Sequence, residues 1–502
     1  MIQKVLVANR GEIAIRVMRS CREMEIKSVA VYSEADRASM HVRYADEAYY
    51  IGPSPSIESY LSINNIIDAA KKSGADAIHP GYGFLSENAE FARRCAEEGI
   101  IFIGPSPESI STMGDKITAR KNMMAAGIPV IPGTVEPITG EKEAIETIRE
   151  IGLPVMIKAS AGGGGKGMRL VKREEDIVSA IRAARSEARA AFGNDAIYIE
   201  KYIESPHHIE FQILGDQHGN IVHLFERECS VQRRHQKVIE ETPSPLMTPE
   251  IREEMGRFAV AAAKAVNYFG AGTIEFIVDE NMNYYFLEMN TRLQVEHPIT
   301  ERVVGVDLVK EQIKIAMGER MTLKQEELKQ NGHAIECRIY AEDPENNFMP
   351  SPGKITHITE PLGLGVRHDG YVYVGYSIPI HYDPLISKLI VWAGTRQEAI
   401  ARMRRALYAY KITGIKTSIP FLARIMENKD FVEGKYNTHF IEKNMEMLMT
   451  REGCGRRCQD MALIAAFIHY TKKNNELKIN NNGCSASNQW KAFGRRKSVN
   501  RL

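Results

Sequence analysis

The sequence predicts an α/β protein with an N-terminal doubly wound parallel sheet domain and a mixed α+β C-terminal domain. Short apolar runs such as Lys4–Ala8 and Ser28–Tyr32 alternate with helical stretches, of which Glu12–Met24 is the first. Strand–helix alternation at this spacing builds parallel sheets with helices on both faces. Farther along, Ile209–Leu214 and Thr273–Val278 read as strands of a second, mixed region.

The strands and helices predicted for the N-terminal region follow one another along the chain. After Lys4–Ala8, the helix Glu12–Met24 has apolar residues at helical spacing. The later elements are the strand Ser28–Tyr32, the helix Ile63–Lys72 and the strands Ala75–His79 and Ile101–Ile103. Parallel sheets bind ligands beyond the carboxyl ends of their strands, where Asn9-Arg10-Gly11 and His79–Gly83 occur.

A second unit extends from about Ile128 to Ile203. Its expected elements are the strand Val155–Lys158, a glycine-rich loop, the helix Asp176–Phe192 and the strand Ala196–Lys201. A third unit reaches about residue 446 and includes an expected strand over Asn283–Val295.

The remaining residues have a different composition. Met461–His469 is apolar and helix-like, Lys472–Gln489 is an asparagine- and serine-rich linker, and Trp490–Leu502 is a basic tail. The tail is either a flexible surface segment or a docking segment.

Composition limits the classes of partner. Lysine and arginine number 65 against 64 acidic residues, a net charge of +1, which gives no global attraction to nucleic acid or to an anionic membrane. The seven cysteines are scattered and odd in number, which favours a reducing cytoplasm. The N-terminus reads as a strand rather than a signal peptide, and no run reaches the ~18 apolar residues of a membrane helix. We expect a cytoplasmic protein.

A glycine-rich loop, Gly162–Gly165, follows the strand that ends at Lys158. Consecutive glycines let backbone N–H groups approach a phosphate, and Lys158 and Lys166 would add positive charge. The spacing is not that of a P-loop, because no serine or threonine follows in register. Taken alone, these residues fit a tight turn as well as a phosphate lid.

A strand with one polar face is predicted over Phe286–Glu296. Because side chains alternate along a strand, one face would carry polar residues only. These are Glu288, Asn290, Arg292, Gln294 and Glu296. A solvated sheet face is the alternative, although such faces usually carry lysine and threonine.

The preceding strand adds a second carboxylate. If Asn281-Met282 form a two-residue turn, Glu275 lies directly opposite Glu288, with Cβ atoms about 5 Å apart. Like charges at that distance repel, and a divalent cation with oxygen ligands relieves the repulsion. We therefore expect a magnesium or manganese site.

Basic residues gather in Gln232–Lys237, where His235 and Lys237 would share a face if the segment is extended. His208, Glu210 and Gln212 alternate with apolar residues in the same way. Basic groups beside a carboxylate-bound cation are what an anionic nucleotide and a second anion require.

With these motifs together, the chain resembles the biotin carboxylases of the ATP-grasp superfamily over roughly residues 1–446. The matching blocks are Ala8–Ala14, His79–Asn88, Met113–Lys116, the glycine loop, Gln232–Lys237 and Glu288–His297. The resemblance implies an N-terminal domain over 1–115, an ATP-grasp domain over 116–330 with a lid at about 130–203, a C-terminal domain over 331–446 and an extension over 447–502.

The resemblance also implies roles for individual residues. ATP would be held by Lys116, Lys158, Gly163, Gly164, Gly165, Glu200, Lys201, Ile203, His208, Gln232, His235 and Leu287. Mg²⁺ or Mn²⁺ would be held by Glu275, Glu288 and Asn290. Bicarbonate would contact Lys237, Arg292, Gln294, Val295 and Glu296, and biotin would contact Arg338 and Tyr82.

The implied catalytic residues are Glu296, Arg292, Lys237 and Arg338. Glu296 would act as the base on bicarbonate, which attacks the γ-phosphate of ATP to give carboxyphosphate. Phosphate would then deprotonate biotin while Arg338 stabilises the enolate-like oxygen.

The expected partners follow from the same resemblance. No biotinylation motif occurs, so biotin must be carried by a separate carrier protein, and we expect a homodimer and a carboxyltransferase subunit. The extension favours the first half-reaction of pyruvate carboxylase; the alternative is acetyl-CoA or another acyl-CoA carboxylase. Two other interpretations are a different ATP-grasp ligase, which would lack the Gln294-Val295-Glu296 and Arg338 combination, and a non-catalytic nucleotide-binding subunit.

Overall fold

The computed structural model describes residues 2–138, 140–159, 168–192, 196–449 and 456–479. The predicted glycine loop with Gly163, Gly164 and Gly165 lies outside the described residues, as does the basic tail Trp490–Leu502. The chain divides into two compact units, Met1–Leu448 and Met449–Leu502, and each is described by itself.

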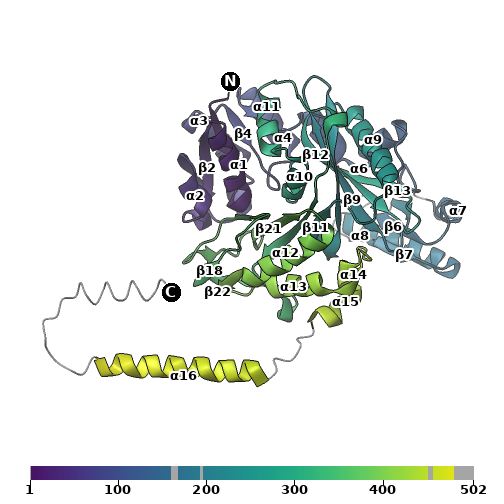
Figure 1. The fold of residues 1–502 in the computed structure, drawn as a ribbon. Coiled ribbons are helices and arrows are strands. Elements are labelled where there is room, and N and C mark those ends of the chain that lie inside the picture. The colour runs from purple at the N-terminus through teal and green to yellow at the C-terminus, as the bar shows by residue number, and fades with distance from the viewer. Residues whose placement is uncertain (1, 139, 160–167, 193–195, 450–455, 480–502) are drawn as a thin grey trace. The chain divides into compact units, whose positions relative to one another are not determined.

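The N-terminal part forms the predicted parallel sheet (Figure 1). Its strands are β1 (Lys4–Val7), β2 (Lys27–Ser33), β3 (Glu47–Gly52), β4 (Ala77–His79) and β5 (Ile101–Phe102). They pair in the order β3-β2-β1-β4-β5, and every pair is parallel. The prediction is therefore confirmed, and β3 is an additional edge strand.

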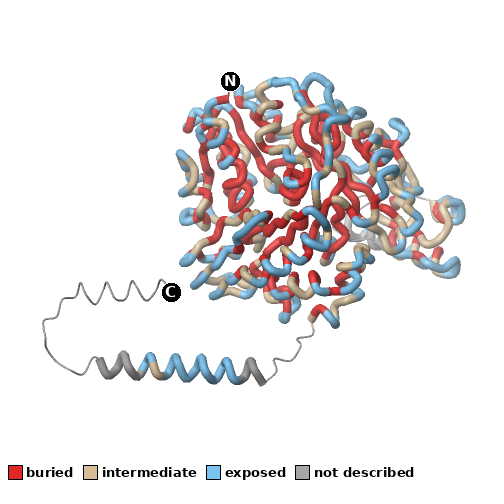
Figure 2. Tube along the Cα trace, in the orientation of Figure 1, coloured by how far each residue is buried: buried red, intermediate tan, exposed pale blue. Residues whose placement is uncertain are grey.

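Helices cover both faces of this sheet. Val5 and Val7 of β1 join one buried core with α1 (Gly11–Glu23) and α11 (Leu308–Ala316). Leu6, from the other face, joins a second core with α3 (Ile63–Ser73) and α4 (Ala89–Glu97). Because successive strand residues point to opposite faces, each apolar residue of β1 is buried, as Figure 2 shows for the strands of this region.

The carboxyl end of β1 is filled by protein side chains. Arg10 is buried and makes a two-bond ion pair with Asp36, at 2.6 Å for Nε to Oδ2 and 2.8 Å for Nη2 to Oδ1. Tyr60 donates to the same carboxylate at 2.7 Å, and the Arg10 guanidinium lies 4.4 Å from the ring centroid of Tyr382. Arg10 therefore ties the parallel sheet to the C-terminal part of the same unit.

A larger antiparallel sheet dominates the rest of unit 1. Its strands are β9 (His207–Gly215), β10 (Ile221–Arg233), β11 (Gln236–Thr242), β12 (Gly270–Val278), β13 (Tyr284–Asn290), β14 (His333–Tyr340), β19 (Val366–Gly370) and β21 (Leu385–Ala393). They pair in the order β13-β12-β9-β10-β11-β14-β21-β19. The sheet is continuous across residue 330, because β11 pairs with β14.

A smaller antiparallel sheet of three strands has its own core. Its strands are β6 (Val155–Ala159), β7 (Met168–Val171) and β8 (Ile197–Lys201), in the order β7-β6-β8. The helices α7 (Glu141–Ile151) and α8 (Ile177–Phe192) cover it, and Ile157, Ile181 and Ile199 are fully buried between them. The strands and the helix that the sequence predicts here are confirmed.

The strand with the polar face is shorter than predicted. β13 ends at Asn290, and residues 291–296 turn into α10 (His297–Val304), so Arg292, Gln294 and Glu296 do not lie on the strand. The hairpin is not closed by Asn281-Met282 either, since Val278 pairs with Tyr284 around a five-residue loop. An irregularity at Leu287 then shifts the register by one residue, and Glu275 still pairs with Glu288.

Further elements surround these sheets. The helices are α2 (Met40–Tyr44), α5 (Pro107–Gly114), α6 (Lys116–Ala125), α9 (Pro249–Ala265), α12 (Arg396–Ala409), α13 (Ile419–Glu427), α14 (Lys429–Val432) and α15 (Phe440–Met449). The short strands are β15 (Glu342–Asp343), β16 (Met349–Pro350), β17 (Gly353–Lys354), β18 (His357–Thr359), β20 (Ser377–Ile378) and β22 (Lys411–Thr413).

The second unit contains one described helix, α16 (Arg456–Ile479). It includes the predicted helical stretch Met461–His469 but is longer, so the expected linker from Lys472 is wrong as far as Ile479. Over the residues described, none of the helices combines the length and the apolar character needed to cross a bilayer.

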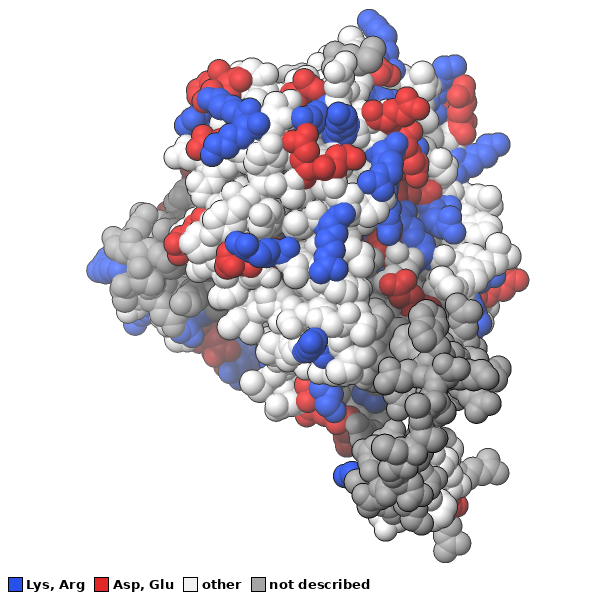
Figure 3. Space-filling model, turned by 90° about the vertical axis from the view of Figure 1, so that its left-hand side faces the viewer, with Lys and Arg blue, Asp and Glu red and all other residues white. Residues whose placement is uncertain are grey.

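The surface carries charges of both signs. On the face shown in Figure 3, lysine and arginine side chains alternate with aspartate and glutamate around a largely uncharged centre. This distribution agrees with a net charge of +1.

Candidate active site

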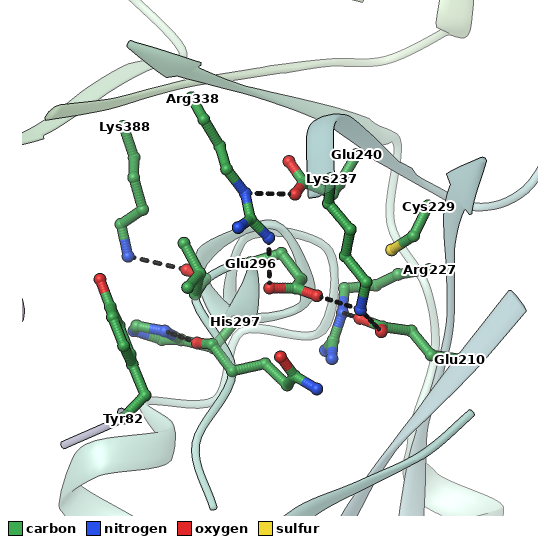
Figure 4. Close-up of polar contacts among 12 residues, drawn as sticks. Tyr82, Glu210, Arg227, Cys229, Lys237, Glu240, Glu296, His297, Arg338 and Lys388 are labelled. Carbon is green, nitrogen blue, oxygen red and sulfur yellow. Dashed lines mark hydrogen bonds and ion pairs between the residues drawn. The ribbon is translucent and has the colours of Figure 1, made fainter. Parts of the chain in front are cut away.

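A buried cluster of charges lies where the large antiparallel sheet meets the segment 291–296 (Figure 4). The Lys237 ammonium group contacts three carboxylates at once. It lies 2.9 Å from Glu275 Oε1 and 2.8 Å from Glu296 Oε1, and it also donates to Glu210. Desolvation opposes each of these charges, and their mutual pairing compensates for it.

A β-bulge directs Lys237 into this cluster. Val231 pairs with Ile239 but Gln232 pairs with Lys237, so Val238 is an extra residue on β11. The predicted arrangement of His235 beside Lys237 is wrong: His235 lies in the turn between β10 and β11 with φ 64°, and its side chain is exposed. The tight turn takes His235 out of the strand, so alternation does not apply to it.

Glu296 is the N-cap residue of α10 and is completely buried. Its second oxygen accepts a hydrogen bond from Arg338 Nη2 at 2.9 Å. Although burial opposes ionisation, Lys237 and Arg338 hold the pKa of Glu296 well below its usual range. Glu296 is therefore an ionised acceptor held by two cations.

A buried arginine that was not predicted orients this cluster. Arg227, fully buried, pairs with Glu210 at 2.5 Å and donates to Gln212 and Thr300 at 2.8 and 2.9 Å. Its position in an alternating strand, facing Glu210 on the neighbouring strand, is the signal that would have identified it.

The predicted carboxylate pair is confirmed in position. Glu275 lies 2.9 Å from His208 Nε2 and accepts hydrogen bonds from Asn290 at 2.9 Å and Gln294 at 3.2 Å. Burial and the charge of Glu275 raise the pKa of Glu288. Two opposed carboxylates with an amide oxygen beside them could hold a divalent cation, which would remove their repulsion.

A cavity of about 230 Å³ opens beside this pair. Its lining residues are Glu87, Ile110, Met113, Gly114, Lys116, Ala119, Leu287, Glu288, Met289, Asn290 and Thr291. Four of the predicted site residues, Lys116, Leu287, Glu288 and Asn290, therefore meet in one cavity.

A second group of possible metal ligands is already neutralised. One ligand atom each from His208, Glu210 and Glu275 lie within 4.8 Å of one another. However, the Lys237 ammonium group contacts both carboxylates. A protein cation thus occupies the position that a metal ion would take.

The predicted nucleotide residues on the three-stranded sheet make local contacts. Lys158 is ion-paired with Glu200, and Lys201 donates to the carbonyl oxygens of Gly152 and Leu153 at 3.1 and 2.8 Å. Ile203 is half-buried. On the large sheet, Gln232 Nε2 lies 3.0 Å from His208 Nδ1, so these two predicted residues are in contact.

Arg292 is held from three sides. It is ion-paired with Glu87 at 2.8 Å, and it donates to Asn290 Oδ1 at 2.9 Å and to Gln294 Oε1 at 3.3 Å. Glu87 belongs to the block His79–Asn88, but its role as the partner of Arg292 was not predicted.

On the other side of Glu296, Arg338 also pairs with Glu240 at 2.6 Å. Tyr82 donates to Glu12, which lies 3.3 Å from the ammonium group of Lys388. Glu240, Glu12 and Lys388 were not predicted, because no local motif distinguishes a buried charged residue from an exposed one.

The chain is similar to known proteins over most of its length. The chain matches "Biotin carboxylase, N-terminal domain" over residues 1–110, "Carbamoyl-phosphate synthase L chain, ATP binding domain" over 115–324 and "Biotin carboxylase C-terminal domain" over 336–443. Biotin carboxylase 1 of Bacillus subtilis is 56% identical over 443 residues, covering 88% of this chain and 98% of that protein. A pyruvate carboxylase subunit of Methanothermobacter thermautotrophicus is 58% identical over 444 residues, covering 88% of this chain and 90% of that protein.

A solved structure is similar over the same range. It is the biotin carboxylase domain dimer of the Hydrogenobacter thermophilus 2-oxoglutarate carboxylase, in complex with MgADP, ADP and bicarbonate. The TM-score is 0.83 at 52% identity, and the match covers 90% of this chain and 100% of that chain.

The charge cluster predicts a pH-dependent loss of stability in Lys237→Met. Without the ammonium group, we expect burial to raise the pKa values of Glu275 and Glu296 above their values in the unfolded chain. The folded state of the variant then binds more protons than its unfolded state. Stability then falls as pH rises through the new folded pKa values, unlike that of the wild type, whose depressed pKa values cause loss only under acid. We expect a loss of about 3–5 kcal/mol that is larger at pH 8 than at pH 5.5.

Urea unfolding at the two pH values measures this difference. Lys329→Met, at an exposed lysine, is the matched control and should leave stability unchanged at both. An equal loss at both pH values would show that Lys237 acts only through packing.

Proposed function

Because the chain belongs to the biotin carboxylase family, we propose that it carboxylates biotin on a separate carrier protein with ATP and bicarbonate. It is an ATP-dependent carboxylase of the ligase class. The observation that carries the proposal is Glu296, held between Lys237 and Arg338 beside a carboxylate pair. We further propose that 1–115, 116–330 and 331–446 act as N-terminal, ATP-grasp and C-terminal domains.

Nucleotide and metal would lie at the cavity beside β13. Lys116 and Leu287 line this cavity. His208, which contacts Gln232, lies 2.9 Å from Glu275, and Glu275 pairs with the lining residue Glu288. Glu275, Glu288 and Asn290 would hold Mg²⁺, which supplies charge compensation for the transferring phosphoryl group. MgADP in the solved Hydrogenobacter relative supports this assignment.

Bicarbonate would bind between Lys237, Arg292 and the segment that ends at Glu296. As an anion, it draws Lys237 and Arg338 away from Glu296, and the pKa of that carboxylate then rises from its depressed value. Glu296 becomes a stronger base when its substrate is present, and it can take the bicarbonate proton as the oxygen attacks the γ-phosphate.

Arg338 would then donate a hydrogen bond to biotin. The guanidinium donates from a buried position to an oxygen that gains negative charge when the ureido nitrogen loses its proton. Tyr82 adjoins this side of the cluster through Glu12 and Lys388. The phosphate released from carboxyphosphate would accept the biotin proton.

We propose that this biotin carboxylation is the first half-reaction of a pyruvate carboxylase; the alternative is the same half-reaction within an acetyl-CoA or other acyl-CoA carboxylase. The relative from Methanothermobacter leaves about a tenth of its length outside the match, as this chain does, whereas the Bacillus biotin carboxylase is covered almost completely. A homodimer is proposed from the dimeric Hydrogenobacter relative.

The extension is proposed to bind the carboxyltransferase subunit. Between Met461 and Tyr470 of α16, the described part of the helix carries large apolar side chains at helical spacing, and these side chains are exposed. They are Met461, Leu463, Ile464, Phe467, Ile468 and Tyr470.

The base assignment predicts that Glu296→Gln loses biotin-dependent ADP release by a factor of about 10²–10⁴. ADP release is measured with ATP, Mg²⁺ and bicarbonate, with and without biotin, and wild-type release should need both bicarbonate and biotin. Glu326→Gln, at an exposed glutamate, is the control. Turnover of Glu296→Gln at the wild-type rate would exclude this base.

The metal assignment predicts opposite effects of Glu288→Gln in the absence and presence of Mg²⁺. Without metal the variant should be more stable, by about 0.2–1 kcal/mol, because the repulsion from Glu275 disappears. With metal, the Mg²⁺ concentration for half-maximal nucleotide binding should rise about tenfold or more, since a charged ligand is lost. Unchanged Mg²⁺ dependence of nucleotide binding would contradict the site.

The partner assignment predicts that Leu463→Lys/Phe467→Lys abolishes co-purification with the carboxyltransferase subunit. Free-biotin carboxylation should remain within about twofold, because α16 lies outside the unit that holds the active site. Lys473→Gln, on the same helix, should leave co-purification intact. Retained co-purification of the double variant would contradict this surface.

A further inference from the structure

Lys388 is a fully buried lysine on β21 whose ammonium group points toward the active site (Figure 4). It donates a hydrogen bond to the carbonyl oxygen of Val295 at 2.8 Å, and it lies 3.3 Å from Glu12 Oε1. An ammonium group without solvent requires such partners. The shorter contact is to the backbone carbonyl rather than to the carboxylate.

The hydrogen bond reaches the segment that carries the proposed base. Val295 immediately precedes Glu296, and residues 291–296 belong to no strand, so no sheet ladder fixes their backbone. Neighbouring side chains fix it instead: His297 Nδ1 lies 2.8 Å from the carbonyl oxygen of Gln294, and Lys388 holds the next carbonyl.

The same ammonium group reaches the other side of the cluster. Glu12 also accepts the hydroxyl proton of Tyr82, and the Lys388 ammonium lies 5.8 Å from the centroid of that ring. Arg338 is the residue directly opposite Lys388 on β14. Lys388 therefore lies next to the segment that carries Glu296, next to Tyr82 and opposite Arg338.

Carboxylates other than Glu12 also face Lys388, and Glu336 on β14 is the fully buried one with which it interacts electrostatically. Asp369 on β19 lies opposite Lys388 in the strand register, but its carboxylate is ion-paired with Arg367 at 2.7 Å. Burial raises the pKa of Glu12, and the nearby Lys388 ammonium group opposes this shift.

We propose that Lys388 is a positioning residue: by holding the Val295 carbonyl, it sets the positions of Gln294 and Glu296 toward bicarbonate, and through Glu12 it sets the position of Tyr82. The inference rests on the proposed function, which assigns Gln294 and Glu296 to bicarbonate. Its signature is a loss of bicarbonate use without a loss of nucleotide binding.

The test compares Glu12→Gln with Glu12→Gln/Lys388→Met. The first variant keeps the lysine and its bond to Val295, and it serves as the reference for the second. The second removes the charges of Glu12 and Lys388 together, so that neither partner of this contact is left without the other. Its kcat/KM for bicarbonate should fall about 10- to 100-fold relative to Glu12→Gln, because a misplaced base and substrate lose alignment. The Kd for ATP should not change, and Lys354→Met is the exposed control.

Equal kcat/KM for bicarbonate in the two variants would overturn the inference, even if the melting temperature of the double variant falls. Should the double variant not fold, Glu12→Gln/Lys388→Arg replaces it, since the longer guanidinium displaces the donor and should raise KM for bicarbonate likewise. Glu296→Gln is run in parallel. If it loses activity while the Lys388 variants do not, this inference fails and the proposed function stands; if it retains activity, the proposed function fails.

Discussion

The contact of the largely buried Lys237 with the buried carboxylates of Glu210, Glu275 and Glu296 is the constraint on which the candidate active site depends. No member of this cluster can be removed without leaving an uncompensated charge in a water-poor interior. Arg227 extends the same balance behind Glu210. Lys237 and Arg338, the cations that would bind a substrate anion under the proposed function, are paired with carboxylates in this structure.

This balance gives the proposed chemistry a built-in order. The cations hold the pKa of Glu296 low, so under the proposed function it would be a poor base until bicarbonate binds. An anion that competes for Lys237 and Arg338 strengthens the base and orients the reactant in one event. A divalent cation at Glu275 and Glu288 would act in the same direction, because it relieves the repulsion that raises the pKa of Glu288.

The large antiparallel sheet makes the cluster possible. Pairing of β11 with β14 puts Lys237 and Glu240 next to Arg338, although about 100 residues separate them in sequence. From β21, the next strand, Lys388 reaches the segment before Glu296. The N-terminal region contributes Glu12 from α1, the helix that follows β1, whereas the carboxyl end of β1 itself is closed by side chains.

The sequence by itself determined the parallel sheet, the strands of the three-stranded sheet and the pairing of Glu275 with Glu288, since local periodicity and spacing encode these features. It predicted that pairing through the wrong turn; a bulge at Leu287 restores the register. Only the tertiary structure decided that the polar strand ends at Asn290, that His235 lies in an exposed turn, and that Lys388 is buried beside Val295. The reason is physical: bulges, turns and buried ion pairs depend on contacts between distant strands, which no local pattern records.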